Sequence, residues 1–276
     1  IDRATLELTQ KPMSDLLDIV LPALLIGLMV SVVHAPLGIE VLRRGIIFID
    51  LAIAQIAGLG FIIAEVLVQS KHIHSAHIHT EHFLSGLSFI PSLGALLFAL
   101  LGGLLFRYIE KHFPALQEAW IGVFFVLSAS LSILVLSNNP HGDEELKHLL
   151  SGQILFATLD DVIFYLPLFG GIFATWMLIP KMRQGLGFYF MFALTITTSV
   201  QLIGIYVVFA SLILPALVTF GRQKPLLYAW LFSSFSIIVG VGLSALLDAP
   251  TGPILVTTYA VLGVLMSIKT VIATRP

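Results

Sequence analysis

The sequence predicts an all-α membrane protein whose chain crosses the bilayer many times. Of its 276 residues, 58% are hydrophobic and only 11% are charged, and the mean hydropathy is +1.01. A soluble domain carries about 25% charged residues, so this chain has too few to cover a soluble surface. Its apolar residues form runs that are long enough, or nearly so, to cross about 30 Å of hydrocarbon. We therefore expect one transmembrane domain over residues 1–276, with eight or nine helices.

The runs can be placed in order. Residues 1–15 are polar and predict a short surface helix, and the first apolar run is expected to stop around His34–Pro36. One later stretch, 187–220, contains Gly204 and Pro215 but no clear polar break, so it predicts either one long broken helix or two crossings. We expect Pro215 to break its helix where protein, not lipid, surrounds the freed backbone groups. The apolar runs cover 16–33, 45–67, 87–106, 120–136, 162–179, 187–201, 202–220, 229–247 and 254–268.

Basic residues predict the orientation of these runs, because they concentrate on the cytoplasmic side. With the N-terminus outside and nine crossings, ten Lys and Arg residues of the chain's 14 lie inside. The histidine-rich segment and the acidic segment 143–145 then lie outside. A single crossing over 187–220 would instead put Arg222 and Lys224 outside, so the charge bias favours two crossings.

Three polar residues within the apolar runs are candidates for a transport path. A carboxylate such as Asp50 costs roughly 2.5–3.5 kcal/mol to insert into a membrane, so it usually faces a partner or a water path. Asp50 either lines the path or pairs with Arg43 or Arg44. Gln55 and Gln201 either line the same path or form interhelical hydrogen bonds worth about 0.6 kcal/mol.

Five histidines between residues 69 and 82 give a compositional hint of metal binding. Imidazole suits zinc, copper or nickel better than manganese or calcium. In an extended strand, alternating residues share a face, so neighbouring histidines could bind a metal loosely outside the membrane. The alternative is a polar loop with no required role. The five residues are His72, His74, His77, His79 and His82.

Several motifs, taken together, resemble a known family. Gly38, Arg43-Arg44 and Asp50 form one; Leu150-Ser-Gly152 followed by Asp160-Asp161 forms a second. The most specific block joins Gly204, Leu212-Ile-Leu-Pro215-Ala216 and Asp248-Ala-Pro250-Thr-Gly252. These motifs, which span most of the chain, are similar to those of the permease subunits of bacterial zinc, manganese and iron ABC importers. The chain departs from that family at Ala54-Gln55, where members commonly place a histidine, and in its short segment 180–185.

The resemblance implies a type II importer-like fold in the bacterial cytoplasmic (inner) membrane. Two copies would enclose a central path, an extracytoplasmic binding protein would deliver the ion, and a separate ATPase would bind the inner face. Basic residues in the predicted inner loops would contact that ATPase, or they only anchor the topology. These residues are Lys181, Arg183, Arg222 and Lys224.

The function predicted is therefore transport of a divalent metal cation, with zinc favoured by the histidines over manganese or iron. The sequence has no Gly-x-x-x-x-Gly-Lys-Ser/Thr motif, so ATP hydrolysis is expected in another subunit, and this chain is not expected to be an enzyme or to bind a cofactor tightly. It has no cysteine, which excludes thiolate metal sites. It has no basic patch that would indicate nucleic-acid binding. The alternative is a stand-alone secondary transporter coupled to protons or sodium, although the sequence shows neither an internal repeat nor further mid-span acids.

Overall fold

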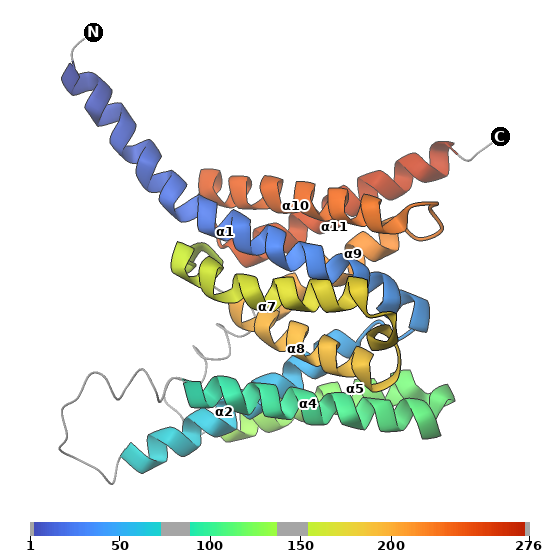
Figure 1. Cartoon of the computed structure of the whole chain (residues 1–276). Coiled ribbons are helices and arrows are strands. Elements are labelled where there is room, and N and C mark those ends of the chain that lie inside the picture. Colours follow the sequence, from blue (N-terminus) through green and yellow to red (C-terminus); the bar gives the residue numbers. More distant parts are fainter. Residues whose placement is uncertain (1–2, 73–88, 137–153, 274–276) are drawn as a thin grey trace. The chain divides into compact units, whose positions relative to one another are not determined.

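The computed structural model confirms the all-α prediction (Figure 1). It describes residues 3–72, 89–136 and 154–273, and their side chains over 19–68, 89–136 and 154–267. Nine α-helices lie in the described ranges, linked in part by the short 3-10 helices η1 (Pro114–Leu116), η2 (Ile154–Phe156) and η3 (Pro180–Arg183). The α-helices are α1 (Arg3–Arg44), α2 (Ile49–His72), α4 (Phe89–His112), α5 (Gln117–Leu136), α7 (Leu159–Leu178), α8 (Gly185–Ile203), α9 (Ile205–Val218), α10 (Pro225–Leu247) and α11 (Thr251–Ala273).

Seven of the described helices are long and apolar enough to cross a membrane. Two shorter apolar helical segments, Ile205–Val218 and Thr251–Ser267, accompany them. With its 14 residues, α9 is about 21 Å long, which is less than the hydrocarbon thickness. The nine apolar runs expected from the sequence thus correspond to these helices, while the number of crossings, eight or nine, stays a prediction.

The chain divides into two compact units. The first unit comprises 1–42, 150–174 and 202–276, and the second comprises 43–149 and 175–201. The single domain expected over 1–276 stays a prediction.

In the second unit, α2 packs against both α4 and α5 (Figure 1). The buried face of α4 carries small residues and one large aromatic, among them Ala95, Ala99 and Phe106. Its opposite face is also apolar, since Leu93, Leu97, Leu101 and Leu104 are each 47–57% exposed. A helix that is apolar on its exposed face as well as its buried face is typical of a membrane span. The leucine face therefore fits contact with lipid.

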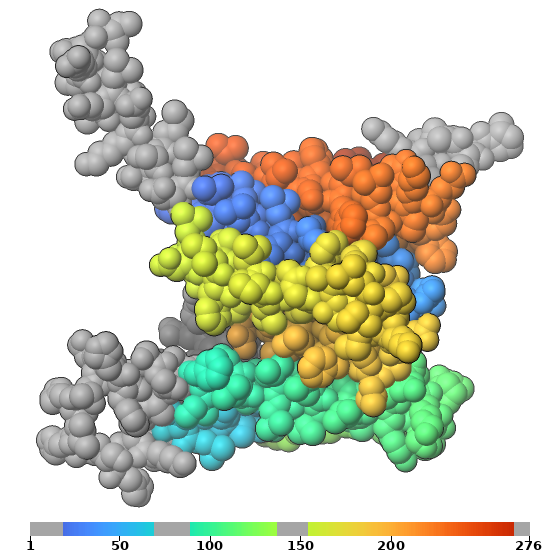
Figure 2. Space-filling model, in the orientation of Figure 1, coloured from blue at the N-terminus to red at the C-terminus, as the bar shows by residue number. Residues whose placement is uncertain are grey.

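In the first unit, α9, α10 and α11 pack together, and α1 lies against α9 and α10. A Cβ added at Gly27 of α1 would lie 2.7 Å from Cγ2 of Ile237 on α10. Figure 2 shows the side chains of α10 (orange) directly against those of α1 (blue). At Gly38, α1 approaches the backbone of α9 so closely that an added Cβ would lie 2.9 Å from the carbonyl carbon of Leu212. Small residues at such positions let helix backbones meet without a side chain between them.

The expectation that the first run stops at His34–Pro36 is wrong, because α1 continues as one helix to Arg44. Residues 1–15, expected to form a separate short helix, belong to α1 from Arg3 onwards. Proline lacks the N–H that would bond the carbonyl four residues earlier, which for Pro36 is that of Val32. The indole N–H of Trp230 on α10 donates to this Val32 carbonyl at 3.0 Å. The partner lost at Pro36 is thus replaced by a side chain from another helix.

The helix break expected at Pro215 is also misplaced. Pro215 lies inside α9, near its C-terminal end, whereas the chain leaves the helical conformation at Gly204, between α8 and α9. Gly204 has φ +79°, a left-handed conformation that glycine adopts without the steric cost of a Cβ. The stretch 187–220 therefore forms two helices, and glycine rather than proline separates them.

Candidate cation site

The most unusual polar residue in the second unit is Asp50. It lies in the first turn of α2, directly after the turn that joins α1 to α2, rather than in the middle of a span. Its side chain is only 1% exposed, and no described side chain donates to either carboxylate oxygen; the backbone N–H groups of Asp50 and Leu51 face the carboxylate but do not reach hydrogen-bonding geometry. A position at a helix N-terminus favours a negative charge through the helix dipole, but only by about 0.3–1 kcal/mol. Buried polar groups without partners are rare and call for a physical explanation.

A second carboxylate, Glu118, lies close to Asp50. It is in the first turn of α5, which packs on α2. The backbone N–H of Phe48, two residues before Asp50, donates to Glu118 Oε1 at 3.4 Å. The other oxygen, Glu118 Oε2, is buried and has no hydrogen-bond partner in the described part of the chain. The charges of the two carboxylates repel each other. Three buried carboxylate oxygens are thus gathered where α2 and α5 begin.

Glu110, on α4 of the same unit, shows the opposite arrangement. Arg44 donates to Glu110 Oε1 at 3.2 Å, and Arg107 donates to Glu110 Oε2. Arg44 also donates to the backbone oxygen of Arg183 at 2.8 Å and lies over the ring of Phe188. These contacts join the end of α1, the end of α4 and the start of α8. Glu110 is therefore a structural anion, paired with two guanidinium groups.

The other two predicted path residues, Gln55 and Gln201, are less buried than Asp50. Gln55 lies five positions after Asp50 on α2, which separates them by about 140° around the helix. Its side chain is partly exposed, as is that of Gln201 near the end of α8. Ala54, one turn after Asp50, is buried. The path role of Gln55 and Gln201 stays a prediction.

The histidine prediction falls almost entirely outside the described residues. His74, His77, His79 and His82 lie in the range that is not described, while His72 is the last residue of α2 and its side chain is not described. Within the described residues, no three His, Asp or Glu side chains gather as a metal cluster. Metal binding by the five histidines stays a prediction.

One histidine that the sequence left without a role is buried in the first unit. His34 on α1 is 0% exposed, and its Nδ1 lies 2.8 Å from Ser211 Oγ on α9. Because the Ser211 hydroxyl donates to the Val208 carbonyl at 3.0 Å, the His34 Nδ1–H is the donor to Ser211. This hydrogen bond lies one turn from the close contact at Gly38, so His34 fastens α1 to α9.

The four residues predicted to contact an ATPase differ in how they are held. Lys181 and Lys224 are exposed. Arg222 lies over the ring of Tyr228. Arg183 donates to two backbone carbonyls in the last turn of α7, at 2.8 and 3.2 Å, and so caps that helix. Contact with an ATPase stays a prediction for all four, and Arg183 has in addition a structural role that the sequence did not reveal.

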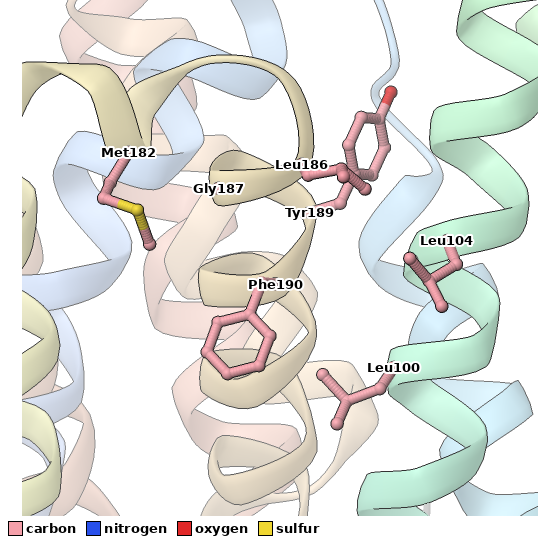
Figure 3. A pocket seen from close by; sticks show the side chains of 8 residues that line it. Leu100, Leu104, Met182, Leu186, Gly187, Tyr189 and Phe190 are labelled. Carbon is pink, nitrogen blue, oxygen red and sulfur yellow. The ribbon is translucent and has the colours of Figure 1, made fainter.

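An open apolar groove of about 480 Å³ lies in the second unit, beside α4 and the start of α8. Figure 3 shows Leu100 and Leu104 on α4, and Leu186 and Phe190 on α8, among its lining side chains. Met182 and Tyr189 also line the groove. The Tyr189 hydroxyl accepts a hydrogen bond from Gln117 at 2.9 Å. The groove offers no carboxylate or imidazole, so it is not a cation site.

Sequence reasoning identified Asp50 but missed Glu118. The fourth run was expected to begin at Trp120, which left Glu118 in a connecting segment. In the structure, α5 begins at Gln117 and Glu118 lies in its first turn. The available signal was an acid directly before an apolar run, a common feature of helix starts. Its proximity to Asp50, 68 residues earlier, has no signature in a single sequence.

The comparisons with known proteins agree with this architecture. The sequence matches the ABC 3 transport family over residues 16–183 and 164–270. It is 24% identical over 268 residues to the manganese transport system membrane protein MntC of Halalkalibacterium halodurans. This match covers 87% of this chain and 83% of the relative.

The fold is similar to that of a solved structure described as PsaBC from Streptococcus pneumoniae in complex with Fab. The TM-score is 0.63 at 19% identity, and the match covers 92% of this chain and 95% of the other. Three findings point to one conclusion: the helices of membrane-spanning length, the family match over most of the sequence, and this similarity of fold. The chain belongs to the ABC 3 transport family, as a multi-pass transmembrane permease subunit and not a catalytic one.

Proposed function

We propose that this chain is the permease of an ATP-driven importer of divalent metal cations. Its family is one of ABC transporters, and one relative is named as a manganese transport membrane protein. The observation that carries the proposal is the buried Asp50 carboxylate, which has no donor among the described side chains. A carboxylate that no resident group neutralises can be neutralised by a passing cation. A path that binds its ion too tightly would not release it, so one such carboxylate suits transport better than a closed metal cage.

The proposed partners follow from what this chain lacks. Its sequence holds no phosphate-binding Gly-x-x-x-x-Gly-Lys-Ser/Thr motif, so a separate ATPase subunit would hydrolyse ATP. A second copy of this chain would complete the path, and an extracytoplasmic metal-binding protein would deliver the ion. The cytoplasmic membrane of a bacterium is the proposed location.

The arginines of the second unit support an orientation. Arg44, Arg107 and Arg183 gather where α1, α4 and η3 end, and basic residues concentrate on the cytoplasmic side. We place this end inside. Asp50 and Glu118, in the first turns of α2 and α5, then lie near the inner end of the path. The exposed Lys181 of η3 would face the ATPase.

Two cargoes compete within this proposal. Zinc is favoured by the histidines between residues 69 and 82, which lie almost wholly outside the described residues. Manganese is favoured by the name of the relative and by the carboxylate oxygens of the site, because carboxylate ligands suit manganese and imidazole suits zinc.

The test measures uptake of radioactive manganese and zinc by cells or proteoliposomes that contain the chain with its ATPase. Asp50→Asn keeps the side-chain shape and removes the charge, and we expect it to abolish uptake while the chain still inserts and associates with the ATPase. The matched control is Asp248→Asn, which removes a charge at an exposed position outside the spans. Normal metal uptake by Asp50→Asn would refute the role of Asp50.

The alternative, a proton- or sodium-coupled transporter, predicts a different result in the same experiment. Uptake would then persist without an ATPase and collapse with the ion gradient. The family match supports the ATP-driven function, and copurification of a Walker-motif ATPase with the chain would separate the two.

A further inference from the structure

We propose that Glu118 is the second ligand of the transported cation, so that Asp50 and Glu118 together form a two-carboxylate site at the inner end of the path. This inference rests on the proposed function, since it assigns a further residue to the same route. It also makes oxygen, rather than imidazole nitrogen, the ligand atom in the described part of the path. The cargo class that this chemistry recognises is a hard divalent cation such as manganese.

The geometry places the two groups together from different helices. Asp50 is held by the first turn of α2, and Glu118 by the first turn of α5. The Phe48 N–H donates to Glu118 Oε1 at 3.4 Å, which places the Glu118 side chain beside the start of α2. The remaining oxygen of Glu118 and both oxygens of Asp50 are left for another partner.

The electrostatics of this pair require a cation or a proton. Two like charges close together in a poorly solvated site destabilise each other, and such a pair usually binds a proton or a positive ion. Nearby arginines do not fill this role, because Arg44 and Arg107 are paired with Glu110 and the guanidinium of Arg183 caps α7. A divalent cation would neutralise both carboxylates at once.

The two carboxylates differ in solvent exposure, which predicts the order in which an ion would meet them. Asp50 is 1% exposed, whereas Glu118 is partly exposed at the start of α5. An ion coming from within the spans would therefore meet Asp50 first and then Glu118, next to the predicted cytoplasmic face. With two carboxylates rather than three or more protein ligands, the ion would keep water in its shell, which favours release.

The ligand type predicts the discrimination between metals. Raw affinity for most sites is higher for zinc than for manganese, so a site can accept manganese only by its ligand type and geometry. Carboxylates alone give zinc less advantage than imidazole does. Replacing Glu118 by histidine should therefore shift the preference towards zinc, although the number of protein ligands is unchanged.

The experiment measures Mn²⁺ binding to the purified chain in lipid nanodiscs by electron paramagnetic resonance of free Mn²⁺, with Zn²⁺ as competitor. Glu118→Gln is the informative variant, because the amide oxygen still accepts the Phe48 N–H while the charge is lost. We expect it to weaken Mn²⁺ binding at least tenfold, and Glu118→Asp to weaken it less. Asp248→Asn serves as the control and should bind as the unmodified chain does.

A second variant tests selectivity. Glu118→His should raise the ratio of zinc to manganese affinity at least tenfold relative to the unmodified chain. Wild-type affinity in Glu118→Gln, or an unchanged metal ratio in Glu118→His, would overturn the inference.

The outcomes also distinguish this inference from the proposed function. If Asp50→Asn loses binding and uptake while Glu118→Gln keeps both, only the role of Glu118 is refuted. If the chain with its ATPase transports neither metal, the proposed function itself fails. In the double variant Asp50→Asn/Glu118→Gln, the loss of binding should be smaller than the two single losses combined, because the two residues act on one ion.

Discussion

The hydrogen bond from Trp230 to α1 leads to a prediction that depends on one proline. Pro36 has no N–H to offer the Val32 carbonyl, and the Trp230 indole supplies the missing donor at 3.0 Å. Trp230→Phe removes this donor but keeps an aromatic ring, which preserves much of the packing on Phe173, where the ring centroids are 6.0 Å apart. In the unmodified background this change leaves the Val32 carbonyl without a partner. In a Pro36→Ala background, the alanine restores a backbone N–H that can bond this carbonyl within α1.

The expected magnitude follows from measured hydrogen bonds between membrane helices, which average about 0.6 kcal/mol and reach about 1.7 kcal/mol. The carbonyl in question has lost its only helical donor, so we expect a value in the upper half of this range. Trp230→Phe should therefore lower the free energy of unfolding of the otherwise unmodified chain by about 1.1–1.7 kcal/mol. In the Pro36→Ala background it should cost at least about 0.6 kcal/mol less, because the helix itself replaces the lost donor.

The assay is a double-mutant cycle of four chains: unmodified, Trp230→Phe, Pro36→Ala and the double variant. The free energy of unfolding is measured in detergent micelles by denaturant titration and followed by circular dichroism. Independent sites add to within about 0.3–0.5 kcal/mol. A coupling energy below that margin would show that Trp230 does not compensate for Pro36, and the unbroken α1 would then need a different physical cause.

Three further predictions concern stability and are measured by thermal unfolding in detergent. Gly38→Ala would force a Cβ into the backbone of α9 and should lower the free energy of unfolding by about 1–3 kcal/mol. Gly242→Ala is the control, because its added Cβ meets nothing within 4 Å, and it should be neutral or stabilising. Equal effects of the two changes would contradict the close contact at Gly38. Arg183→Ala should lower the free energy of unfolding by about 2–4 kcal/mol even without an ATPase, because the α7 cap is lost. An unchanged free energy of unfolding would mean that Arg183 has no structural role and that contact with a partner is the only role left for it. Tyr259→Phe should cost about 1–3 kcal/mol by leaving buried Ser233 Oγ without its 2.6 Å partner, and adding Ser233→Ala should recover part of it.

Composition and periodicity were sufficient for the fold class, because apolar runs of membrane length have few other structures available to them. They did not locate the helix ends. At Pro36, the carbonyl that loses its helical donor is bonded by Trp230, which is far away in the sequence. Between Gly204 and Pro215, both residues signal a break. Only the backbone shows that the positive φ of Gly204 separates the helices while α9 accommodates Pro215.

Only part of the candidate site was predictable from the sequence. A carboxylate in an apolar run is visible in the sequence, so Asp50 was found. Its partner Glu118 was not, because a helix start and a connecting segment look alike there and the contact is not local. The assignment of Arg183 to a partner surface overlooked its backbone contacts, since a sequence does not show which carbonyls a guanidinium reaches.

The carboxylates of the second unit differ in whether a side chain neutralises them. Arg44 and Arg107 pair with Glu110, while Arg183 caps α7. Asp50 and Glu118, at the starts of α2 and α5 of the same unit, keep three buried carboxylate oxygens that no described side chain neutralises. A structural carboxylate gains stability from a fixed partner, whereas a transport carboxylate must exchange its partner at every cycle. That Asp50 accepts from no described side chain, and Glu118 Oε2 from no described group, therefore supports the proposed cation path.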